Sequence, residues 1–209
     1  MDFNFGLYPV ITEEFCNGRD MLDVVKAVID GGVKIVQLRQ KYSTKKNLYL
    51  LAKKYREITK KNNVKLIIND HLDIVQAIDA DGIHLGQDDL PCKVARKILP
   101  DIIIGVSTHN QNEIIKAEND GATYVNIGPI FLTNTKKLSI KALGLDYLKS
   151  VKVNIPFTVM GGIKRDNIIK VLECNAKNIA MVTEITMADD ITKKTKELVK
   201  IINDFIIKV

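Results

Sequence analysis

Short apolar runs alternate with longer amphipathic stretches along the chain, and the runs recur at a spacing of roughly 20 to 30 residues. The runs are mostly continuous rather than alternating, which is typical of parallel strands covered on both faces. We therefore predict strands at Gly6–Ile11, Lys34–Leu38, Lys65–Ile68, Gly82–Leu85, Ile102–Val106, Tyr124–Ile127, Phe157–Met160 and Asn178–Val182.

The stretches between the strands carry apolar residues at helical spacing, with residues that begin and end helices. Thr44 or Ser43 can cap one helix, and Asn110 with Glu113 three residues later resembles a capping box. The predicted helices are Asp20–Ile29, Lys45–Lys61, Pro91–Leu99, Asn110–Asn119, Leu145–Lys152, Asp166–Glu173 and Ile191–Ile206.

This alternation, without a linker or a break in composition, predicts a single (β/α)₈ TIM barrel of eight parallel strands that spans residues 1–209 as one domain. A chain of 209 residues can bury one large core but is short for two ordinary domains. An open doubly wound sheet is the alternative. It normally has fewer strands, and no GxGxxG fingerprint follows the first predicted strand.

Composition narrows the class of protein. Apolar residues make up 46% and charged residues 27% of the chain, as in globular enzymes, and no apolar run is long enough to span a membrane. The first residues lack the basic and apolar regions of a signal peptide. Cys16, Cys92 and Cys174 lie far apart, which predicts reduced thiols in a cytoplasmic protein.

The formal net charge of +6 raises the question of nucleic acid. Nucleic-acid binders usually gather basic residues on one face with aromatic residues for stacking. Here the lysines are dispersed, Trp is absent and aromatic residues are only 6% of the chain. We expect small anionic substrates instead of nucleic acid, and a basic nucleic-acid-binding barrel is kept as a non-enzymatic alternative.

Candidate chemistry lies where the predicted strands end, because barrel enzymes build their sites at the C-terminal ends of the strands. Gln37, Arg39 and Lys41 are two residues apart, so an extended chain places them on one face. If that face is the interior, the two cations need an anion, because burying them without one would cost several kcal/mol. The alternative places them on the outer face, with their charges in solvent.

Acidic residues follow the next two predicted strands. Asp70 ends the third, and Asp88 and Asp89 lie in the loop after the fourth. Carboxylates from neighbouring strand ends suit Mg²⁺, which takes oxygen ligands and often one or two carboxylates beside substrate phosphates. The alternative is ordinary turn chemistry, since Asn-Asp and Asp-Asp pairs favour loops.

Three further places offer donors to an anion. Ser107 ends the fifth strand, and the loop after the sixth carries Thr133, Asn134, Thr135 and Lys136. Gly161-Gly162 after the seventh strand and Thr183 after the eighth match the phosphate site that recurs in this fold. His84, by contrast, is predicted to be a hydrogen-bonded histidine of the barrel wall.

In these segments the chain resembles the thiamine-phosphate synthase family. The resemblance covers nearly the whole chain and rests on seven motifs in order, which are QLRQK, IIND, GIHLGQDDLP, GVSTHN, GPIFLTNTKK, GGI and MVT. It implies a transferase that joins 4-amino-2-methyl-5-(diphosphooxymethyl)pyrimidine to 4-methyl-5-(2-phosphoethyl)thiazole, giving thiamine phosphate and diphosphate. The implied mechanism is dissociative, with diphosphate leaving before the thiazole nitrogen attacks.

The resemblance also implies roles for individual residues. The residues expected to hold the pyrimidine diphosphate are Gln37, Arg39, Lys41, Asn69, Ser107 and Lys136. Those expected to hold the thiazole phosphate are Thr133, Asn134, Thr135, Gly162, Val182 and Thr183. Asp70 and Asp89 are expected to bind Mg²⁺ as the cofactor.

The chain departs from the family pattern at two positions. Leu132 stands where the family usually has proline, and Met160 stands where a small or branched residue is common. We interpret both as packing changes, although Leu132 could alter how the loop after the sixth strand closes. The nearest alternative function is a thiazole tautomerase on the same barrel. It needs no diphosphate or Mg²⁺ site, so Arg39, Lys41 and Asp70 would have no ligand to bind. The oligomeric state is open, with a homodimer as one option.

Overall fold

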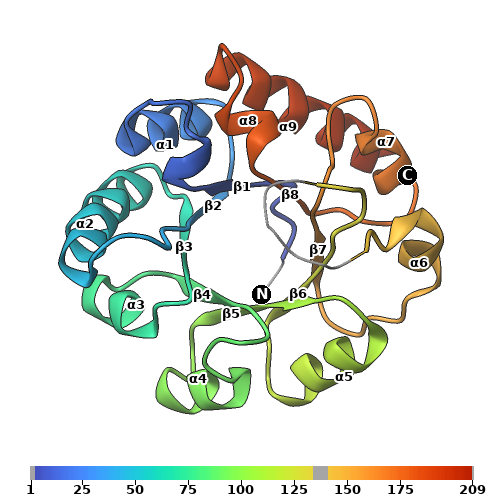
Figure 1. Ribbon diagram of the computed structural model, residues 1–209. Helices are drawn as coiled ribbons and strands as arrows, with labels where there is room; N and C mark the ends of the chain where they lie inside the picture. Colours follow the sequence, from blue (N-terminus) through green and yellow to red (C-terminus); the bar gives the residue numbers. More distant parts are fainter. Residues whose placement is uncertain (1–2, 134–140, 209) are drawn as a thin grey trace.

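The computed structural model describes residues 3–133 and 141–208. Within them the strands form a closed, all-parallel barrel in which each strand pairs with the next along the chain and β8 returns to β1 (Figure 1). The strands are β1 (Leu7–Ile11), β2 (Ile35–Leu38), β3 (Lys65–Asn69), β4 (Gly82–Leu85), β5 (Ile103–Thr108), β6 (Tyr124–Ile127), β7 (Phe157–Val159) and β8 (Ile179–Met181). The predicted TIM barrel is confirmed.

Helices surround the ring of strands (Figure 1). They are η1 (Glu13–Phe15), α1 (Met21–Asp30), α2 (Lys45–Lys61), α3 (Leu72–Ile78), α4 (Cys92–Ile98), α5 (Gln111–Asn119), α6 (Gly144–Ser150), α7 (Ile168–Leu172), α8 (Thr183–Thr186) and α9 (Ile191–Lys208). Thr44 caps α2, and Asn110 caps α5 by accepting from the Glu113 N–H. The Glu113 carboxylate accepts in return from the His109 N–H and from Asn110 Nδ2, so the expected capping box is present in a variant form. In the part of the chain that the structure describes, no helix is long and apolar enough to cross a membrane.

The differences from the predicted elements are local. The sequence prediction omitted three short helices: η1 after β1, α3 after β3 and α8 after β8. Strand β5 continues two residues beyond Val106, because Ser107 and Thr108 pair with Asn126 and Ile127 of β6. These two polar residues therefore remain part of the strand, although the apolar pattern alone predicts that the strand ends before them.

Two apolar clusters divide the core. The larger one fills the layer between the outer face of the strands and the helices. The smaller one lies inside the barrel, where Tyr8, Ile35, Ile67, Ile103 and Tyr124 meet. Cys16, Cys92 and Cys174 are buried free thiols, as expected for reduced cysteines.

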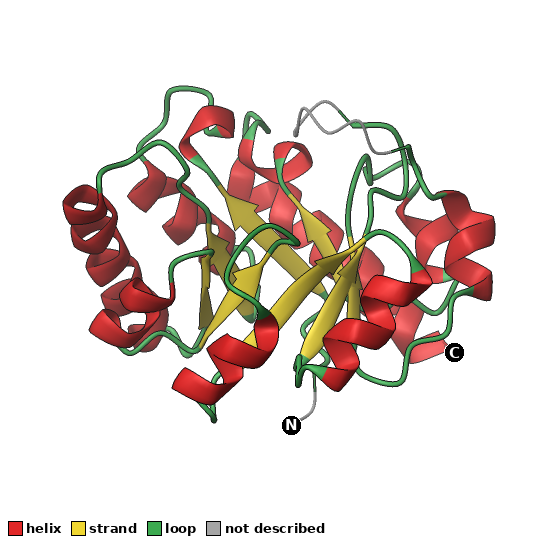
Figure 2. Cartoon of the chain, turned by 60° about the horizontal axis from the view of Figure 1, so that its bottom comes forward, coloured by secondary structure: helices red, strands yellow, loops and turns green. Residues whose placement is uncertain are grey.

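The N-terminal segment closes the barrel at the end where the strands begin (Figure 2). Phe3 is 5% exposed and stacks on the Tyr124 ring with centroids 4.6 Å apart. The side-chain oxygen of Asn178 accepts hydrogen bonds from the N–H groups of Phe5 and Gly6, at 2.8 and 3.2 Å. This end of the barrel is therefore filled by side chains, which leaves chemistry to the opposite end.

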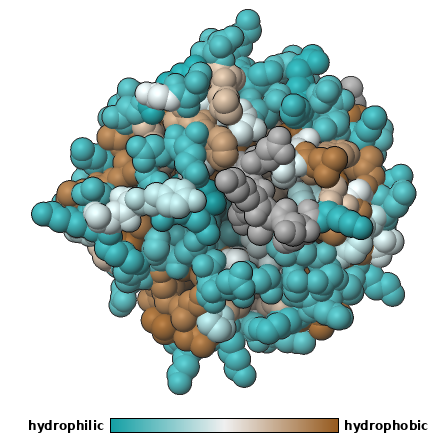
Figure 3. Space-filling view, in the orientation of Figure 1, coloured by the Kyte–Doolittle hydropathy of each residue, from teal (hydrophilic) through white to brown (hydrophobic). Residues whose placement is uncertain are grey.

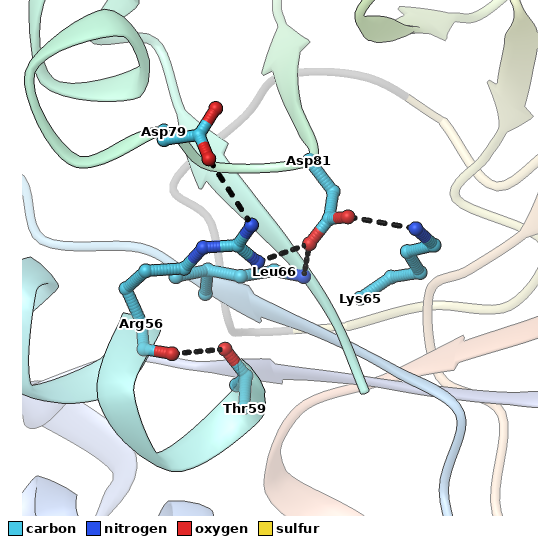
Figure 4. Close-up of polar contacts among 6 residues, drawn as sticks. All are labelled: Arg56, Thr59, Lys65, Leu66, Asp79 and Asp81. Carbon is cyan, nitrogen blue, oxygen red and sulfur yellow. Dashed lines mark hydrogen bonds and ion pairs between the residues drawn. The ribbon is translucent and has the colours of Figure 1, made fainter. Parts of the chain in front are cut away.

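A group of charged residues stabilises the same end from outside (Figure 4). One carboxylate oxygen of Asp81 lies 2.7 Å from Arg56 Nη1, and the other lies 2.8 Å from Lys65 Nζ. The Leu66 N–H also donates to Asp81, at 3.0 Å. Burial acts to raise the pKa of Asp81, but the hydrogen bonds from Lys65 and Leu66 and the charge of Arg56 outweigh it, so its pKa is lowered.

We predict that Asp81→Asn lowers the free energy of unfolding at neutral pH by about 1–3 kcal/mol, because it leaves two cations beside a neutral amide. Since the pKa of Asp81 is lowered on folding, its contribution is present at neutral pH and is lost as pH falls below the ordinary carboxyl range. Denaturant unfolding at several pH values measures both effects. Asp79→Asn is the control, because Asp79 is 91% exposed and lies 3.8 Å from Arg56. An equal loss for both variants would contradict the role of Asp81.

Candidate active site

The candidate residues that the structure describes gather at the C-terminal ends of the strands. Gln37 lies in β2 and is 3% exposed, Asn69 ends β3, and Ser107 lies near the end of β5. Thr183 begins α8 directly after β8. Hydrophilic residues make up most of the surface in the view of Figure 3, with apolar residues between them. Asn134, Thr135 and Lys136 lie outside the described residues.

The two cations after β2 each have an acidic neighbour. Arg39 donates its backbone N–H to the Ile11 carbonyl oxygen, so it continues the pairing with β1 beyond the end of the strand. Its side chain is 13% exposed, with Nη1 3.7 Å from a Glu14 carboxylate oxygen. Lys41 lies in the bend that follows, and its Nζ is 3.4 Å from Asp70 Oδ2. The requirement for an anion, argued from the sequence for buried cations, applies to Arg39, which has Glu14 as its neighbour, whereas Lys41 is 40% exposed and keeps contact with solvent.

Asp70 and Asp89 bring two carboxyl groups into contact. Asp70 follows β3 with φ +64°, and its N–H donates to the His84 carbonyl oxygen at the end of β4. The carboxyl group of Asp89, which accepts from the Gly86 N–H at 2.6 Å, lies close enough to that of Asp70 to perturb its ionisation. Burial, followed by the hydrogen bond and the charge of Asp89, raises the pKa of Asp70 to about 6, although Lys41 opposes the shift.

This carboxyl pair is a donor set that fits a hard divalent cation. Mg²⁺ takes oxygen ligands and is commonly bound by one or two carboxylates, with phosphate oxygens and water completing the shell. Among the described residues, no group of three or more His, Cys, Asp or Glu side chains gathers at one point. A pair of carboxylates leaves the other ligand positions of such a cation to water or phosphate oxygens. Asp88, beside Asp89, is exposed.

Ser107 belongs to a buried hydrogen-bonded group that the sequence did not reveal. Its Oγ is 2.9 Å from His84 Nε2, and His84 Nδ1 is 2.9 Å from the Tyr124 hydroxyl. Gln87 Nε2 donates to the Ser107 carbonyl oxygen at 2.6 Å. His84 is hydrogen-bonded in the barrel wall, as predicted. Its partners depend on strand register, which a single sequence does not display.

The glycine pair after β7 packs against the segment that leaves β6. Gly161 and Gly162 have φ values of +100° and +63°. A β-carbon at Gly162 would lie 2.5 Å from the Leu132 carbonyl oxygen and 2.7 Å from Phe131 Cβ. Glycine is thus required here for contact between two loops, in addition to the left-handed backbone. The carbonyl oxygen of Gly162 accepts from Asn167 Nδ2 at 3.0 Å.

The comparisons with known proteins agree with this geometry. The family model described as thiamine monophosphate synthase matches residues 7–185. The chain belongs to this family. The resemblance noted from the sequence, and with it the enzyme class, is therefore confirmed.

Curated relatives of the family align over nearly their whole length. A thiamine-phosphate synthase of Caldicellulosiruptor saccharolyticus is 43% identical over 205 residues, which cover 97% of this chain and 93% of the relative. One from Clostridium novyi is 42% identical over 96% of this chain and 100% of its own.

Solved structures support the same conclusion. The structure of thiamine phosphate pyrophosphorylase from Pyrococcus furiosus has a TM-score of 0.87 and 32% identity, covering 97% of each chain. A 3-hexulose-6-phosphate synthase from Salmonella typhimurium has a TM-score of 0.70 at 14% identity over 96% of this chain and 99% of its own, a likeness of fold alone.

The two departures from the family pattern differ in their surroundings. Met160 packs against the apolar cluster inside the barrel, as expected for a packing change. Leu132 is 86% exposed, so the same interpretation fails for its side chain. Its backbone is what contacts a neighbour, since its carbonyl oxygen lies against Gly162.

We predict that Asp70→Asn raises the free energy of unfolding of the metal-free protein by about 1–2 kcal/mol at neutral pH. Because folding raises the pKa of Asp70 from 3.8 to about 6, ionisation of Asp70 opposes folding, and stability falls as pH rises through this range. The gain of the variant should therefore vanish at acidic pH. Unfolding in a chelating buffer at several pH values measures it.

Asp79→Asn is the matched control for this substitution, because Asp79 also has a left-handed backbone, with φ +55°, and is exposed. This control shows how much of the stability gain comes from the preference of asparagine for a left-handed backbone and how much from removing the charge. An equal gain for both variants would refute the electrostatic explanation.

Proposed function

We propose that the chain condenses 4-amino-2-methyl-5-(diphosphooxymethyl)pyrimidine with 4-methyl-5-(2-phosphoethyl)thiazole to give thiamine phosphate and diphosphate. The contact between Asp70 and Asp89, beside Lys41, is the observation that carries the proposal, because it prepares a place for a cation bound with a diphosphate. Membership of the family and the names of the relatives support the same reaction. The proposed setting is the cytoplasm, with small anionic substrates and no nucleic acid.

The proposed pyrimidine-diphosphate site combines Gln37, Arg39, Lys41, Asn69 and Ser107 with Lys136. Mg²⁺ bound by Asp70 and Asp89 would neutralise charge on the diphosphate. Arg39 and Lys41 would exchange their present carboxylate neighbours for phosphate oxygens and stabilise the negative charge that grows as diphosphate leaves. A dissociative departure needs no protein nucleophile, so positioned charges supply the catalysis.

The proposed thiazole-phosphate site lies on the other side of the same face, after β6, β7 and β8. Thr133, Gly162, Val182 and Thr183 would form it together with Asn134 and Thr135. The contact of Gly162 with Phe131 and Leu132 supports this grouping, because it joins the loops after β6 and β7. A thiazole tautomerase would need no diphosphate site, and the contact between Asp70 and Asp89 argues against it.

The proposed reaction is tested by incubating the purified chain with both substrates and Mg²⁺ and detecting thiamine phosphate by mass. We expect the product only when all three are present. Failure to form it with a folded protein would refute the proposed function. Steeply salt-dependent binding of DNA or RNA would instead favour the nucleic-acid-binding alternative.

We predict that Asp89→Asn weakens activation by Mg²⁺ by at least about tenfold, because it removes one of two carboxylate ligands. Asp88→Asn is the matched control, since Asp88 is the exposed neighbour in the same loop. Titration of activity with Mg²⁺ measures the difference. Full activity after exhaustive chelation would refute the metal site, and equal effects of the two variants would contradict the assignment to Asp89.

We predict that Gly162→Ala raises the KM for the thiazole phosphate about tenfold, because the new methyl group pushes the Leu132 backbone and the adjoining Thr133 away. Binding of the pyrimidine diphosphate should change little. Gly144→Ala is the matched control: Gly144 also has a positive φ of +78°, but a β-carbon there meets nothing within 4 Å. Steady-state kinetics for each substrate measures both. An equal loss for the two substrates in Gly162→Ala would contradict two separate pockets.

A further inference from the structure

Five buried side chains from five strands form one continuous chain of hydrogen bonds inside the barrel. Gln37 Nε2 donates to the Tyr8 hydroxyl at 2.9 Å, and the Tyr8 and Tyr124 hydroxyl oxygens are 3.0 Å apart. The Tyr124 hydroxyl is 2.9 Å from His84 Nδ1, and His84 Nε2 is 2.9 Å from Ser107 Oγ. Each residue is at most 7% exposed. This series of hydrogen bonds thus connects Gln37 and Ser107 of the proposed pyrimidine-diphosphate site. Tyr8, Tyr124 and His84 form the connection below them.

The donor at one end of this series of hydrogen bonds determines which group donates in each of the others. Because Gln37 donates to Tyr8, the Tyr8 proton goes to Tyr124, its other hydroxyl partner among the described residues. The Tyr124 proton then goes to His84 Nδ1. The opposite direction would leave the Tyr8 proton without an acceptor in a buried place, which is unfavourable. Burial raises the pKa of both tyrosines, so both hydroxyl groups keep their protons.

This direction determines the state of the histidine ring. A neutral imidazole carries one proton, and the ring nitrogen that accepts a hydrogen bond cannot carry it. Since Nδ1 of His84 accepts from Tyr124, the proton lies on Nε2 and is donated to Ser107 Oγ. The oxygen of Ser107 is then occupied as an acceptor, and its own proton is free to point toward the open end of the barrel.

We propose that His84 is a positioning residue, which Tyr124 holds as the Nε2–H tautomer so that the Ser107 hydroxyl donates to an oxygen of the bound diphosphate. The proposal rests on the proposed function for the identity of that anion. With the other tautomer, Ser107 would donate to His84 and present only lone pairs to a negatively charged substrate. The donor–acceptor order of these hydrogen bonds therefore decides whether the Ser107 hydroxyl attracts or repels the diphosphate.

Tight packing holds the five hydrogen-bonded side chains in place. A β-carbon at Gly105 would overlap the Tyr124 ring, so glycine at this place in β5 makes room for it. Phe3 stacks on the same ring. Gln87 fixes the main chain of Ser107 through its carbonyl oxygen. Tyr124 and Ser107 thus have little freedom to rearrange, and removal of one hydroxyl group should not be compensated by movement of another.

The tautomer can be observed directly in the wild-type protein, without substrate. Long-range ¹H–¹⁵N NMR spectra distinguish the Nε2–H form, the Nδ1–H form and the charged ring. The chain has three histidines, His71, His84 and His109, and replacing each in turn by Gln assigns the signals. We expect the Nε2–H form for His84. The Nδ1–H form or an imidazolium would overturn the proposal.

A double-mutant cycle tests the consequence for the substrate. Tyr124→Phe keeps the ring but removes its hydroxyl group, and we expect kcat/KM for the pyrimidine diphosphate to fall about tenfold. Ser107→Ala should cost at least as much, and Tyr124→Phe should have no further effect when combined with it, because Tyr124 acts through Ser107. Independent, multiplying losses would overturn the proposal.

Tyr55→Phe is the matched control. Tyr55 is fully buried, and its hydroxyl donates to the Met21 carbonyl oxygen outside the barrel, with no connection to His84. It should change kcat/KM by less than about twofold, and a loss equal to that of Tyr124→Phe would overturn the proposal. If the wild-type protein makes no thiamine phosphate, the proposed function fails, whereas the NMR spectrum still decides the tautomer.

Discussion

Closing eight parallel strands on themselves directs every second side chain into one narrow column, and in this protein the column changes from apolar to polar along its length. Ile35, Ile67 and Ile103 fill the closed end with apolar side chains. Gln37, Asn69 and Ser107 follow two or four residues later on the same strands, and with His84 of β4 they fill the open end with polar side chains. Because polar groups in such a space must bond one another, the strand register also determines which groups face a substrate.

The same type of side chain has opposite effects at the two ends of the barrel. Asp81 lies at the closed end among Arg56, Lys65 and the Leu66 N–H, and its pKa is lowered. Asp70 lies at the open end against Asp89, and its pKa is raised. The first carboxylate favours folding, whereas the second is an unfavourable arrangement that a bound cation would relieve. Residues needed for chemistry are commonly less than optimal for stability in this way.

The positions of the strands could be predicted because most of their residues are apolar, and observed boundaries differ from predicted ones by at most two residues. The helix α3 was missed because Asn69, Asp70 and His71 resemble an ordinary loop and only seven helical residues follow. The acidic pair was accessible from the sequence, since consecutive strands are neighbours in a barrel. The contact between Tyr8 and Tyr124 was not, because it joins residues 116 positions apart across the interior.

The hydrogen bonds between Asn178 and the N-terminal segment affect the order of events during synthesis on the ribosome. Asn178, which holds the backbone of Phe3, Phe5 and Gly6, is separated from Phe5 by 173 positions. Strand β1 also receives its second neighbour only when β8 is available. Phe3 and Phe5 are synthesised long before Asn178, so this segment reaches its final contacts only after most of the barrel has been made. Barrel closure is a late step, and unfinished chains lack these contacts.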